Sequence, residues 1–309
     1  MLTQIQGLHH VTSLASSASA NNAFFTDVLG LRRVKKTVNF DAPDVYHLYY
    51  GDETGTPGTV MTYFPFPNAA RGKRGTGEVG RTAFTIPKGT SAFWADRLAA
   101  MGAGDVATDT RFGARRVLFN GPDDDAFALV EGDDTRAPWI SEGIDADQAI
   151  RGFHSADMVL RDDGATRELL GFMGYDKVET AGDTTRFMIE GGNAANLIDV
   201  TTAPDAPAAQ QSAGSVHHIA FAVENRARQL EVREALLDTG WQVTPVIDRD
   251  YFWAIYFRTP GGVLFEIATN EPGFDRDEDT QHLGEALKLP SQHEHLRARL
   301  ERQLEPLGD

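Results

Sequence analysis

The chain has 309 residues, of which 45 are acidic and 29 basic, giving a formal net charge of −16. A surface of this sign repels nucleic acid and anionic membranes, and no apolar run reaches the length of a membrane-spanning helix. Cysteine is absent, which excludes disulfides, thiolate metal sites and cysteine nucleophiles. We therefore expect a cytoplasmic protein without nucleic-acid or membrane partners, in which nitrogen and oxygen atoms hold any metal.

A fourfold repeat runs along the chain. Four segments with the alternation of short strands each precede an amphipathic helix that ends near a glycine. His10, Thr82 and His154 are 72 residues apart and lie 20 residues before their glycines, while His218 lies 22 residues before Gly240. The four segments are Leu8–Leu14, Arg81–Ile86, Gly152–Leu160 and Val216–Val223.

Each helix is followed by β-rich sequence. The last strand of each unit is expected at Gly58–Phe64, Asp125–Glu131, Asn196–Thr201 and Gly261–Thr269. The pattern predicts an α+β fold of four βαβββ modules. In the first module, Asn22–Gly30 has apolar residues at helical spacing, with Asn21 or Asn22 as the N-cap.

The modules are expected to pair into two domains, residues 1–140 and 141–275, separated by the polar stretch Asp133–Asp147. Residues 276–309 form a charged tail in which Gln292–Leu304 is predicted to be helical. The tail helix either packs on its own domain or, like an exposed sheet edge, offers a surface for a homo-oligomer.

Two histidine pairs open the first and fourth modules, His9-His10 in LHHVT and His217-His218 in VHHIAF. Adjacent side chains of a strand point to opposite faces, so one member of each pair is expected to face a concave site. The repeat places His10 and His218 in equivalent positions. Two such pairs favour metal ligands over satisfied or exposed histidines.

Glu266 supplies a carboxylate in the otherwise apolar strand Val263–Ile267. A carboxylate in such a run needs a metal or a charged partner. The alternative to a metal is a salt bridge with Arg249 or Arg258. An antiparallel closure of the first and last strands of the fourth module would bring Glu266 to His218. Two imidazoles and one carboxylate suit iron(II), with manganese(II) as the alternative ion.

The other modules offer weaker ligand sets. TPGTVMTY at Thr56–Tyr63 aligns with TPGGVLFE at Thr259–Glu266, which puts Tyr63 where the fourth module has Glu266. Three protein ligands therefore remain at the first site. In the third module, His154 and Asp199 occupy positions that resemble those of His218 and Glu266. They would form either a second metal site or, more simply, a decayed repeat.

These motifs resemble those of a known superfamily. The repeated modules with HH and FE motifs are similar to vicinal oxygen chelate proteins, which include glyoxalases and extradiol dioxygenases. The strings YHLYYGDETGTPGTVMTYFP, RGFHSADMVL and YFRTPGGVLFEIAT resemble hydroquinone ring-cleaving dioxygenases, the group that includes 2,6-dichlorohydroquinone 1,2-dioxygenase. The resemblance extends from about Leu8 to the tail and implies two domains built as half-open β-barrels.

The resemblance also implies roles for single residues. The metal ligands would be His10, His218 and Glu266. His9 and His217 would lie close to the metal, either supporting its ligands or acting as acid–base groups. The residues that contact substrate would be Arg249, Tyr256 and Thr12. The alternative for Arg249 is that it is simply an exposed surface residue.

The expected reaction is cleavage of a hydroquinone-type or related dihydroxy-aromatic ring with O2, in which His217 moves protons. One alternative is a glyoxalase-like lyase or thiol transferase, which commonly uses four protein ligands with nickel or zinc. The other is a non-enzymatic protein that binds an aromatic drug without metal.

Overall fold

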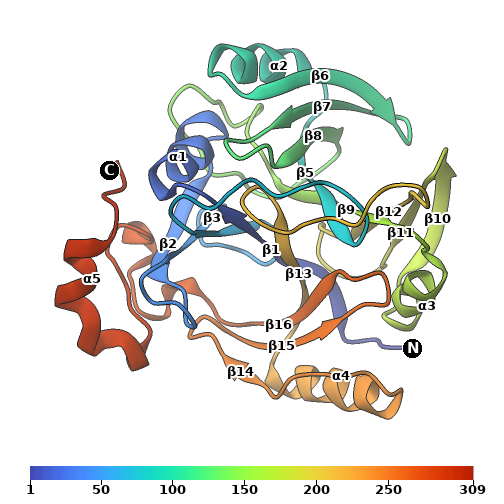
Figure 1. Cartoon of the computed structure of the whole chain (residues 1–309). Coiled ribbons are helices and arrows are strands. Elements are labelled where there is room, and N and C mark those ends of the chain that lie inside the picture. The colour runs from blue at the N-terminus through green and yellow to red at the C-terminus, as the bar shows by residue number, and fades with distance from the viewer. Residues whose placement is uncertain (309) are drawn as a thin grey trace.

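The computed structural model describes residues 1–308, which form two eight-stranded sheets with helices at their margins (Figure 1). The first module comprises β1 (Ile5–Ala15), α1 (Ala18–Ala23), a π-helical turn η1 (Phe24–Val28), β2 (Arg32–Val38), β3 (Tyr46–Gly51) and β4 (Val60–Pro65). The second comprises β5 (Glu78–Pro87), α2 (Ser91–Ala100), β6 (Gly104–Arg111), β7 (Ala114–Asn120) and β8 (Ala126–Gly132).

The third module comprises β9 (Gly152–Leu160), α3 (Gly164–Phe172), β10 (Asp176–Ala181), β11 (Thr184–Met188) and β12 (Leu197–Thr202). The fourth comprises β13 (Val216–Val223), α4 (Arg226–Asp238), β14 (Ile247–Asp248), β15 (Phe252–Arg258) and β16 (Leu264–Pro272). Each module thus has the expected order of strand, helix and three strands, and the α+β fold class is confirmed.

The first and last strands of every module run parallel, which corrects the expected antiparallel closure. β1 pairs with β4, β5 with β8, β9 with β12 and β13 with β16, all in parallel. The helix returns the chain to the start of the module, and the two antiparallel turns that follow cancel one another. The last strand therefore has the direction of the first.

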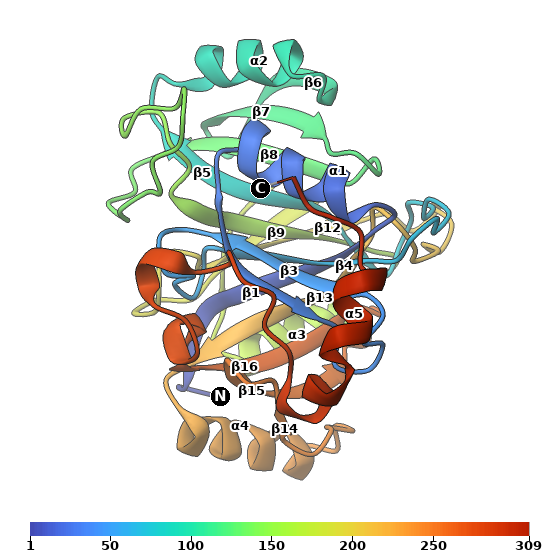
Figure 2. The ribbon, with the colours of Figure 1, turned by 90° about the vertical axis from the view of Figure 1, so that its left-hand side faces the viewer.

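The modules combine differently from the expected domains 1–140 and 141–275. One sheet has the order β14-β15-β16-β13-β1-β4-β3-β2 and joins modules four and one, while the other has the order β10-β11-β12-β9-β5-β8-β7-β6 and joins modules three and two. Figure 2 shows the second sheet above the first. At the level of the sheets, the expected pairing of consecutive modules is wrong.

The two connections between the sheets lie side by side. Isolated bridges join Arg71 to Ala213 and Lys73 to Gln210, so the segment leading into module two runs along the segment returning to module four. The chain crosses to the second sheet, builds two modules there and returns. A preference for pairing sequential neighbours therefore predicts modules two and three correctly but misses the partner of module one.

The first helix begins earlier than expected. Ser17 is its N-cap and accepts a hydrogen bond from the Ala20 amide over 3.2 Å, while Asn21 and Asn22 lie inside the helix and are buried. Phe25 belongs to the π-helical turn that follows and is fully buried in the core. The amphipathic pattern is confirmed as core packing, but the cap lies four or five residues upstream of the expected one.

The two faces of the β1–β13 sheet have different roles. Val11, Ile219 and Phe265 lie on the face that packs in the main hydrophobic core, which draws residues from both sheets. Because side chains alternate along a strand, His10 and His218 lie on the other face, the concave interior of the curled sheet. The concave face is where the predicted ligands meet.

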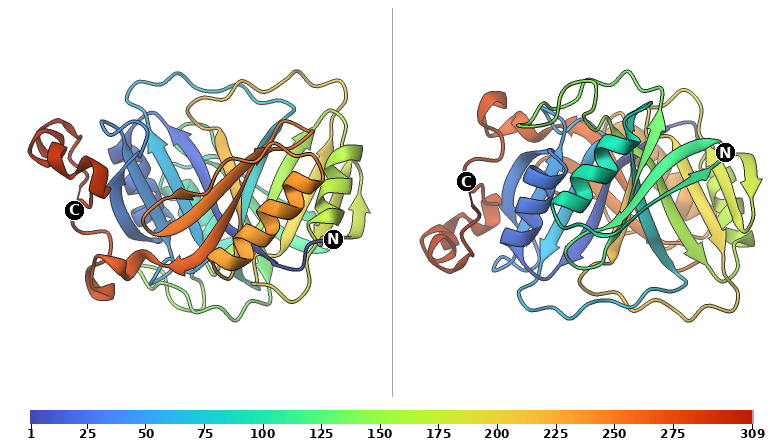
Figure 3. Two further views of the ribbon diagram at one scale, coloured as in Figure 1. Left: turned by 90° about the horizontal axis from the view of Figure 1, so that it is seen from below. Right: turned by 90° about the horizontal axis from the view of Figure 1, so that it is seen from above.

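The tail covers the outside of module one, beside β2 and β3 (Figures 2 and 3). It contains the 3-10 turns η2 (Phe274–Arg276), η3 (Thr280–His282) and η4 (Ser291–Leu296) and the helix α5 (Arg297–Gln303). The fully buried Lys35 ammonium lies 2.7 Å from an Asp277 oxygen and 2.5 Å from a Glu278 oxygen. The helical tail is confirmed and packs on its own chain.

None of the helices formed by residues 1–308 combines the length and apolar character needed to cross a membrane.

Candidate metal centre

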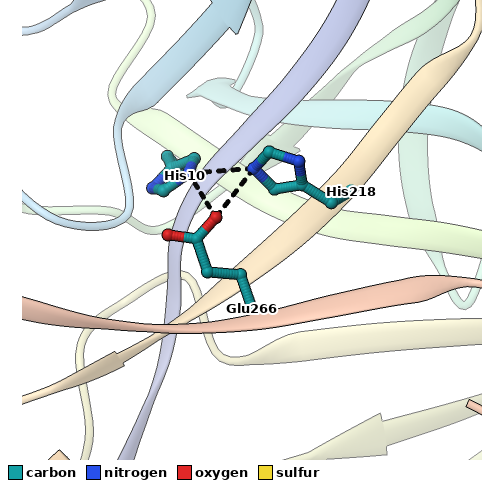
Figure 4. A group of neighbouring side chains, drawn as sticks. All are labelled: His10, His218 and Glu266. Carbon is teal, nitrogen blue, oxygen red and sulfur yellow. Dashed lines mark hydrogen bonds and ion pairs between the residues drawn. The ribbon is translucent and has the colours of Figure 1, made fainter. Parts of the chain in front are cut away.

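His10, His218 and Glu266 meet on the concave face of the β1–β13 sheet (Figure 4). The Nε2 atoms of the two histidines lie 3.3 Å apart, and the Oε2 atom of Glu266 lies 2.9 Å from His218 Nε2 and 3.4 Å from His10 Nε2. In residues 1–308 this is the one group of histidines and carboxylates close enough to hold a metal ion. The three predicted ligands are therefore brought together by β1, β13 and β16.

The strand register explains how they converge. On the antiparallel β1–β13 pair, His10 stands opposite Ala220 and His218 stands opposite Thr12. On the parallel β13–β16 pair, Glu266 stands opposite the same Ala220. The small alanine side chain lies between His10 and Glu266 along the sheet, which leaves space above it for the three larger side chains.

The charge state of the cluster fits a divalent cation. Glu266 is completely buried, and among residues 1–308 its carboxylate meets the imidazoles of His10 and His218 but no lysine or arginine. Burial opposes its ionisation, but attraction to His10 and His218 holds the pKa of Glu266 well below its usual range. Burial lowers the pKa of His218. A neutral imidazole and an ionised buried carboxylate are the states that a metal ion requires of its ligands.

Each ligand histidine is hydrogen-bonded to its neighbour in sequence. His9 Nδ1 lies 2.9 Å from His10 Nδ1, and His217 Nδ1 lies 2.7 Å from His218 Nδ1. If Nε2 of a ligand presents its lone pair to a metal, its Nδ1 carries the proton and donates it to the neighbour. The neighbour then accepts at Nδ1 and carries its own proton on Nε2.

The two neighbours differ in what their Nε2 atoms meet. His9 Nε2 lies 3.1 Å from the carbonyl oxygen of Thr269, so its proton is held by the backbone. His217 lines the cavity beside the triad, and among residues 1–308 its Nε2 atom has no hydrogen-bond partner. Both members of the second pair thus border the cavity, contrary to strict alternation, because their rings turn edge to face at 80°.

Burial keeps both neighbours neutral. It lowers the pKa of His9 to about 3 and that of His217 to about 4, with the adjacent ligand histidine acting in the same direction. A neutral His217 has one proton on Nε2 and can exchange it with a bound molecule. His9 lies outside the cavity wall, packed on Phe252.

A cavity of about 490 Å³ opens over the triad. Its walls are mostly apolar, and they include Phe40, Phe64, Phe66, Phe252 and Leu264. This size and lining suit a small aromatic molecule.

Arg249 and Tyr256, the residues expected to contact substrate, both border the cavity. Arg249 Nε donates to the Tyr256 hydroxyl over 3.2 Å, and its guanidinium lies 3.5 Å from Asp41 and over the ring of Phe40. Tyr256 stands opposite Glu266 on the neighbouring strand. Burial, and then the charge of Glu266, raise the pKa of Tyr256, so its phenol remains protonated. Neither Arg249 nor Arg258 forms an ion pair with Glu266 among the described residues; Arg258 donates to the Gly262 carbonyl instead.

Thr12 and Tyr63 do not occupy their expected places. Thr12 is fully buried behind the cavity wall and accepts a hydrogen bond from Thr62. In the fourth module, Glu266 stands opposite Ala220, the residue two positions after His218. In the first module, the residue two positions after His10 is Thr12, and Thr62 stands opposite it. Thr62, and not Tyr63, is thus equivalent to Glu266. Tyr63 points to the other face and donates to Asp125.

His47 and Tyr49 also belong to the cavity wall and were not expected there from the sequence. They alternate along β3 within YHLYYG and therefore share a face, and Tyr49 stands opposite Thr62 on β4. Alternation of polar and aromatic side chains beside a ligand-bearing strand was the signal available for them. It carries less weight than a repeated histidine pair.

The third module does not form a second metal site. Asp199 stands opposite Asp157, and Arg111 contacts both carboxylates while Arg186 binds Asp199 through two hydrogen bonds of 2.8 Å. His154 bonds to the Ser155 hydroxyl at 3.2 Å instead of to Asp199. Guanidinium groups thus supply the positive charge beside Asp199. The interpretation as a decayed repeat agrees with these contacts.

Paired βαβββ modules with a histidine–histidine–carboxylate cluster define a metal-site protein of the glyoxalase and dioxygenase class. Residues 161–267 match the family model described as the Glyoxalase/Bleomycin resistance protein/Dioxygenase superfamily. The chain is 41% identical over 308 residues to MhqO of Bacillus subtilis (strain 168), which is named as a ring-cleaving dioxygenase, covering 99% of this chain and 98% of MhqO. It is 36% identical to the chlorohydroquinone/hydroquinone 1,2-dioxygenase of Sphingobium indicum, covering 94% and 93% of the two chains.

Solved structures agree with the sequence relatives. A Bacillus subtilis protein described as a dioxygenase superposes with a TM-score of 0.95 at 40% identity, covering 99% of this chain and 98% of that one. Glyoxalase I from Zea mays superposes with a TM-score of 0.64 at 12% identity, covering 86% and 92%, which shows a common fold alone. The chain belongs to the glyoxalase and dioxygenase superfamily, and within it to the ring-cleaving dioxygenases.

Proposed function

We propose that the protein is an iron(II)-dependent dioxygenase that opens hydroquinone-type aromatic rings with O2. The observation that carries the proposal is the buried triad of His10, His218 and Glu266, which offers three ligand atoms on one side of a cavity. The two imidazoles and the carboxylate would hold a divalent iron and would leave room beside it for a substrate and for dioxygen. Manganese(II) has similar ligand preferences and is the alternative ion.

When bound, the metal would hold substrate and dioxygen together and pass electron density between them. The apolar cavity walls would exclude water and hold the ring flat between aromatic side chains. A cavity of about 490 Å³ accommodates a substituted benzene ring. The fixed walls orient the ring toward the triad, and this orientation favours reaction.

Arg249 and Tyr256 would bind the ring oxygen nearest to Glu266. The Tyr256 phenol accepts a hydrogen bond from Arg249, and its own proton interacts with Glu266. With a metal bound to Glu266, that proton would be available for donation to a substrate oxygen. The guanidinium charge stabilises a deprotonated ring oxygen and the negative charge that develops as the ring is attacked. Arg249 is also held by Asp41 and Phe40, which fixes its position at the cavity mouth.

His217 would move protons between the substrate and the cavity. His217 lines the cavity, and its Nε2 atom has no hydrogen-bond partner among residues 1–308, whereas the proton of His9 is engaged with a backbone carbonyl. We therefore assign the acid–base role to His217 and an orienting role to His9. From the sequence, proton transfer was expected at His217, while His9 was expected to be a supporting or an acid–base group.

The lyase alternative expects a fourth protein ligand. By register the fourth position belongs to Thr62, whose hydroxyl proton is donated to Thr12. A threonine hydroxyl is a poor ligand for nickel or zinc compared with a carboxylate. The drug-binding alternative has no use for an ionised buried carboxylate, which would be costly without a cation.

The test is anaerobic reconstitution with iron(II), followed by oxygen uptake with hydroquinone, methylhydroquinone, chlorohydroquinones and catechol. We expect stoichiometric uptake with the hydroquinones and none in the Glu266→Ala variant. As a matched control, Glu78→Ala removes a buried carboxylate outside the triad and should retain iron and uptake. Full iron loading without uptake across the panel would overturn the proposal, and nickel or zinc with glutathione adducts would then be tested.

A further inference from the structure

A chain of four buried side chains ends at the cavity wall. The Tyr49 hydroxyl lies 2.8 Å from His47 Nδ1, and His47 Nε2 lies 2.9 Å from the Thr62 hydroxyl. Thr62 in turn donates to the Thr12 hydroxyl over 2.9 Å. The four side chains are at most 8% exposed, and the first two line the cavity. The chain spans strands β1, β4 and β3.

Counting protons fixes the direction of every bond. Thr62 has one hydroxyl proton, and it is donated to Thr12. Thr62 must therefore accept from His47, so the imidazole proton is on Nε2. His47 Nδ1 then carries a lone pair and can only accept, so the Tyr49 hydroxyl donates to it. Tyr49 is left with oxygen lone pairs and no proton to give.

The electrostatic surroundings preserve this arrangement. Burial holds the pKa of His47 well below its usual range, and the neighbouring His10 and His218 act in the same direction, so the ring keeps a single proton. Burial raises the pKa of Tyr49 well above its usual range, so the phenol stays protonated. The aromatic neighbours of His47, with ring centroids 4.0 Å away at Tyr49 and 4.3 Å away at Phe64, prevent it from turning over.

We propose that Tyr49 is a specificity-determining hydrogen-bond acceptor for a hydroxyl group on the aromatic substrate, at the ring position that does not face the metal triad. His47, Thr62 and Thr12 are positioning residues that oblige Tyr49 to accept. The inference rests on the proposed function, since it assumes an aromatic ring with one oxygen at the triad. It selects rings with two separated hydroxyl groups over ethers of the same shape.

The selection follows from what an ether would lose. A second hydroxyl donates to Tyr49 and extends the chain by one bond. A methoxy oxygen has no proton, so it would face the Tyr49 oxygen with both acceptors unpaired, which is unfavourable in a buried site. Hydroquinone is therefore expected to bind more tightly than 4-methoxyphenol, although the ether is the more apolar ligand.

The first test measures binding without turnover. The iron(II)-loaded protein is titrated anaerobically with hydroquinone and 4-methoxyphenol by calorimetry. In Tyr49→Phe, hydroquinone affinity should fall roughly 2- to 10-fold, as expected for the loss of one hydrogen bond, while 4-methoxyphenol affinity stays unchanged. The control is Tyr50→Phe, which removes a buried hydroxyl with no hydrogen-bond partner on the opposite face of the same strand.

The second test reverses the direction of the bond. In His47→Phe the Tyr49 hydroxyl loses its acceptor, and its proton becomes available to the ligand. Affinity for 4-methoxyphenol should then rise while affinity for hydroquinone does not. Circular dichroism and iron stoichiometry establish that each variant is folded; if His47→Phe does not fold, the Tyr49→Phe affinity ratio decides alone.

Equal losses of both ligands in Tyr49→Phe, or no loss of either, would overturn the inference. Failure of the proposed function is recognised separately, by wild-type protein that binds hydroquinone with the expected preference but consumes no oxygen. Conversely, wild-type turnover of hydroquinone combined with unchanged binding in Tyr49→Phe would refute the role of Tyr49 alone.

Discussion

Replacing His217 by asparagine distinguishes its hydrogen bond with His218 from its contribution to the cavity. The asparagine side-chain oxygen occupies nearly the place of imidazole Nδ1, so it can still accept the proton from His218 Nδ1, now 2.7 Å from His217. The Nε2 proton at the cavity is lost. The same change at His9 keeps the contact with His10 and removes only the bond to the Thr269 carbonyl. The two variants are therefore matched in everything except access to the cavity.

The expected magnitudes differ accordingly. Loss of a positioned general acid–base group lowers turnover by about 10²- to 10⁴-fold, so His217→Asn should lose that much in kcat. Removing the partner of a metal-bound histidine typically lowers metal affinity about 10- to 100-fold, and the asparagine oxygen should keep both variants nearer to wild type. For His9→Asn we expect kcat within about 10-fold of wild type, since its proton is committed to the backbone.

The assay is initial-rate oxygen uptake with hydroquinone at saturating iron(II), together with iron affinity by competition with a chelator. The account predicts low kcat with bound iron for His217→Asn and near-normal kcat for His9→Asn. If the His9 variant loses kcat as severely as the His217 variant while both hold iron, the reasoning from proton positions is wrong.

Three further predictions concern stability and binding. Burial lowers the pKa of His9 from 6.5 to about 3 and that of His217 from 6.5 to about 4, so on acidification the unfolded chain binds protons before the folded one. The metal-free protein should therefore lose stability as pH falls below 6.5 toward 4. Urea midpoints that stay constant over this range would contradict the prediction. Lys35→Met leaves the Glu278 carboxylate, 4% exposed, without its cation; urea denaturation should show a loss of about 3–5 kcal/mol, partly restored by Glu278→Gln in the same chain. Arg249→Lys loses the bond to Tyr256 and should lower kcat/KM about 10- to 100-fold, and an unchanged value would remove Arg249 from the reaction.

The modules and the triad could be predicted from sequence because their local patterns are visible without tertiary information. The histidine pairs recur in equivalent places, and Glu266 interrupts an apolar strand, so each carries a signal without any tertiary information. The alternation of β1 and β13 then puts His10 and His218 on one face. No modelling of loops is needed for these inferences.

The errors arose where one residue of register or one choice of partner decides the outcome. A shift of one residue moves a strand position to the other face, and the alignment of Tyr63 with Glu266 contains such a shift, because β4 places Thr62 there instead. Module pairing depends on which first strands meet across the antiparallel β1–β13 and β5–β9 contacts. Local sequence contains no information on that choice.

His217 was the residue expected to move protons, but the structural difference between His9 and His217 was beyond the sequence. The two pairs read alike, and only the position of the Thr269 carbonyl distinguishes them. That carbonyl lies on β16, some 260 residues from His9 in the chain. His47 was missed for a similar reason, since its partners Thr62 and Tyr49 become a chain only when β3 and β4 pair.

The most direct test of the central claim is the mass of the product formed from hydroquinone by the iron(II)-loaded protein under O2. The account predicts a ring-opened acid that contains all the atoms of hydroquinone and both atoms of one dioxygen molecule. Formation of benzoquinone, with the ring intact and two hydrogen atoms lost, would show oxidation without cleavage and would contradict it.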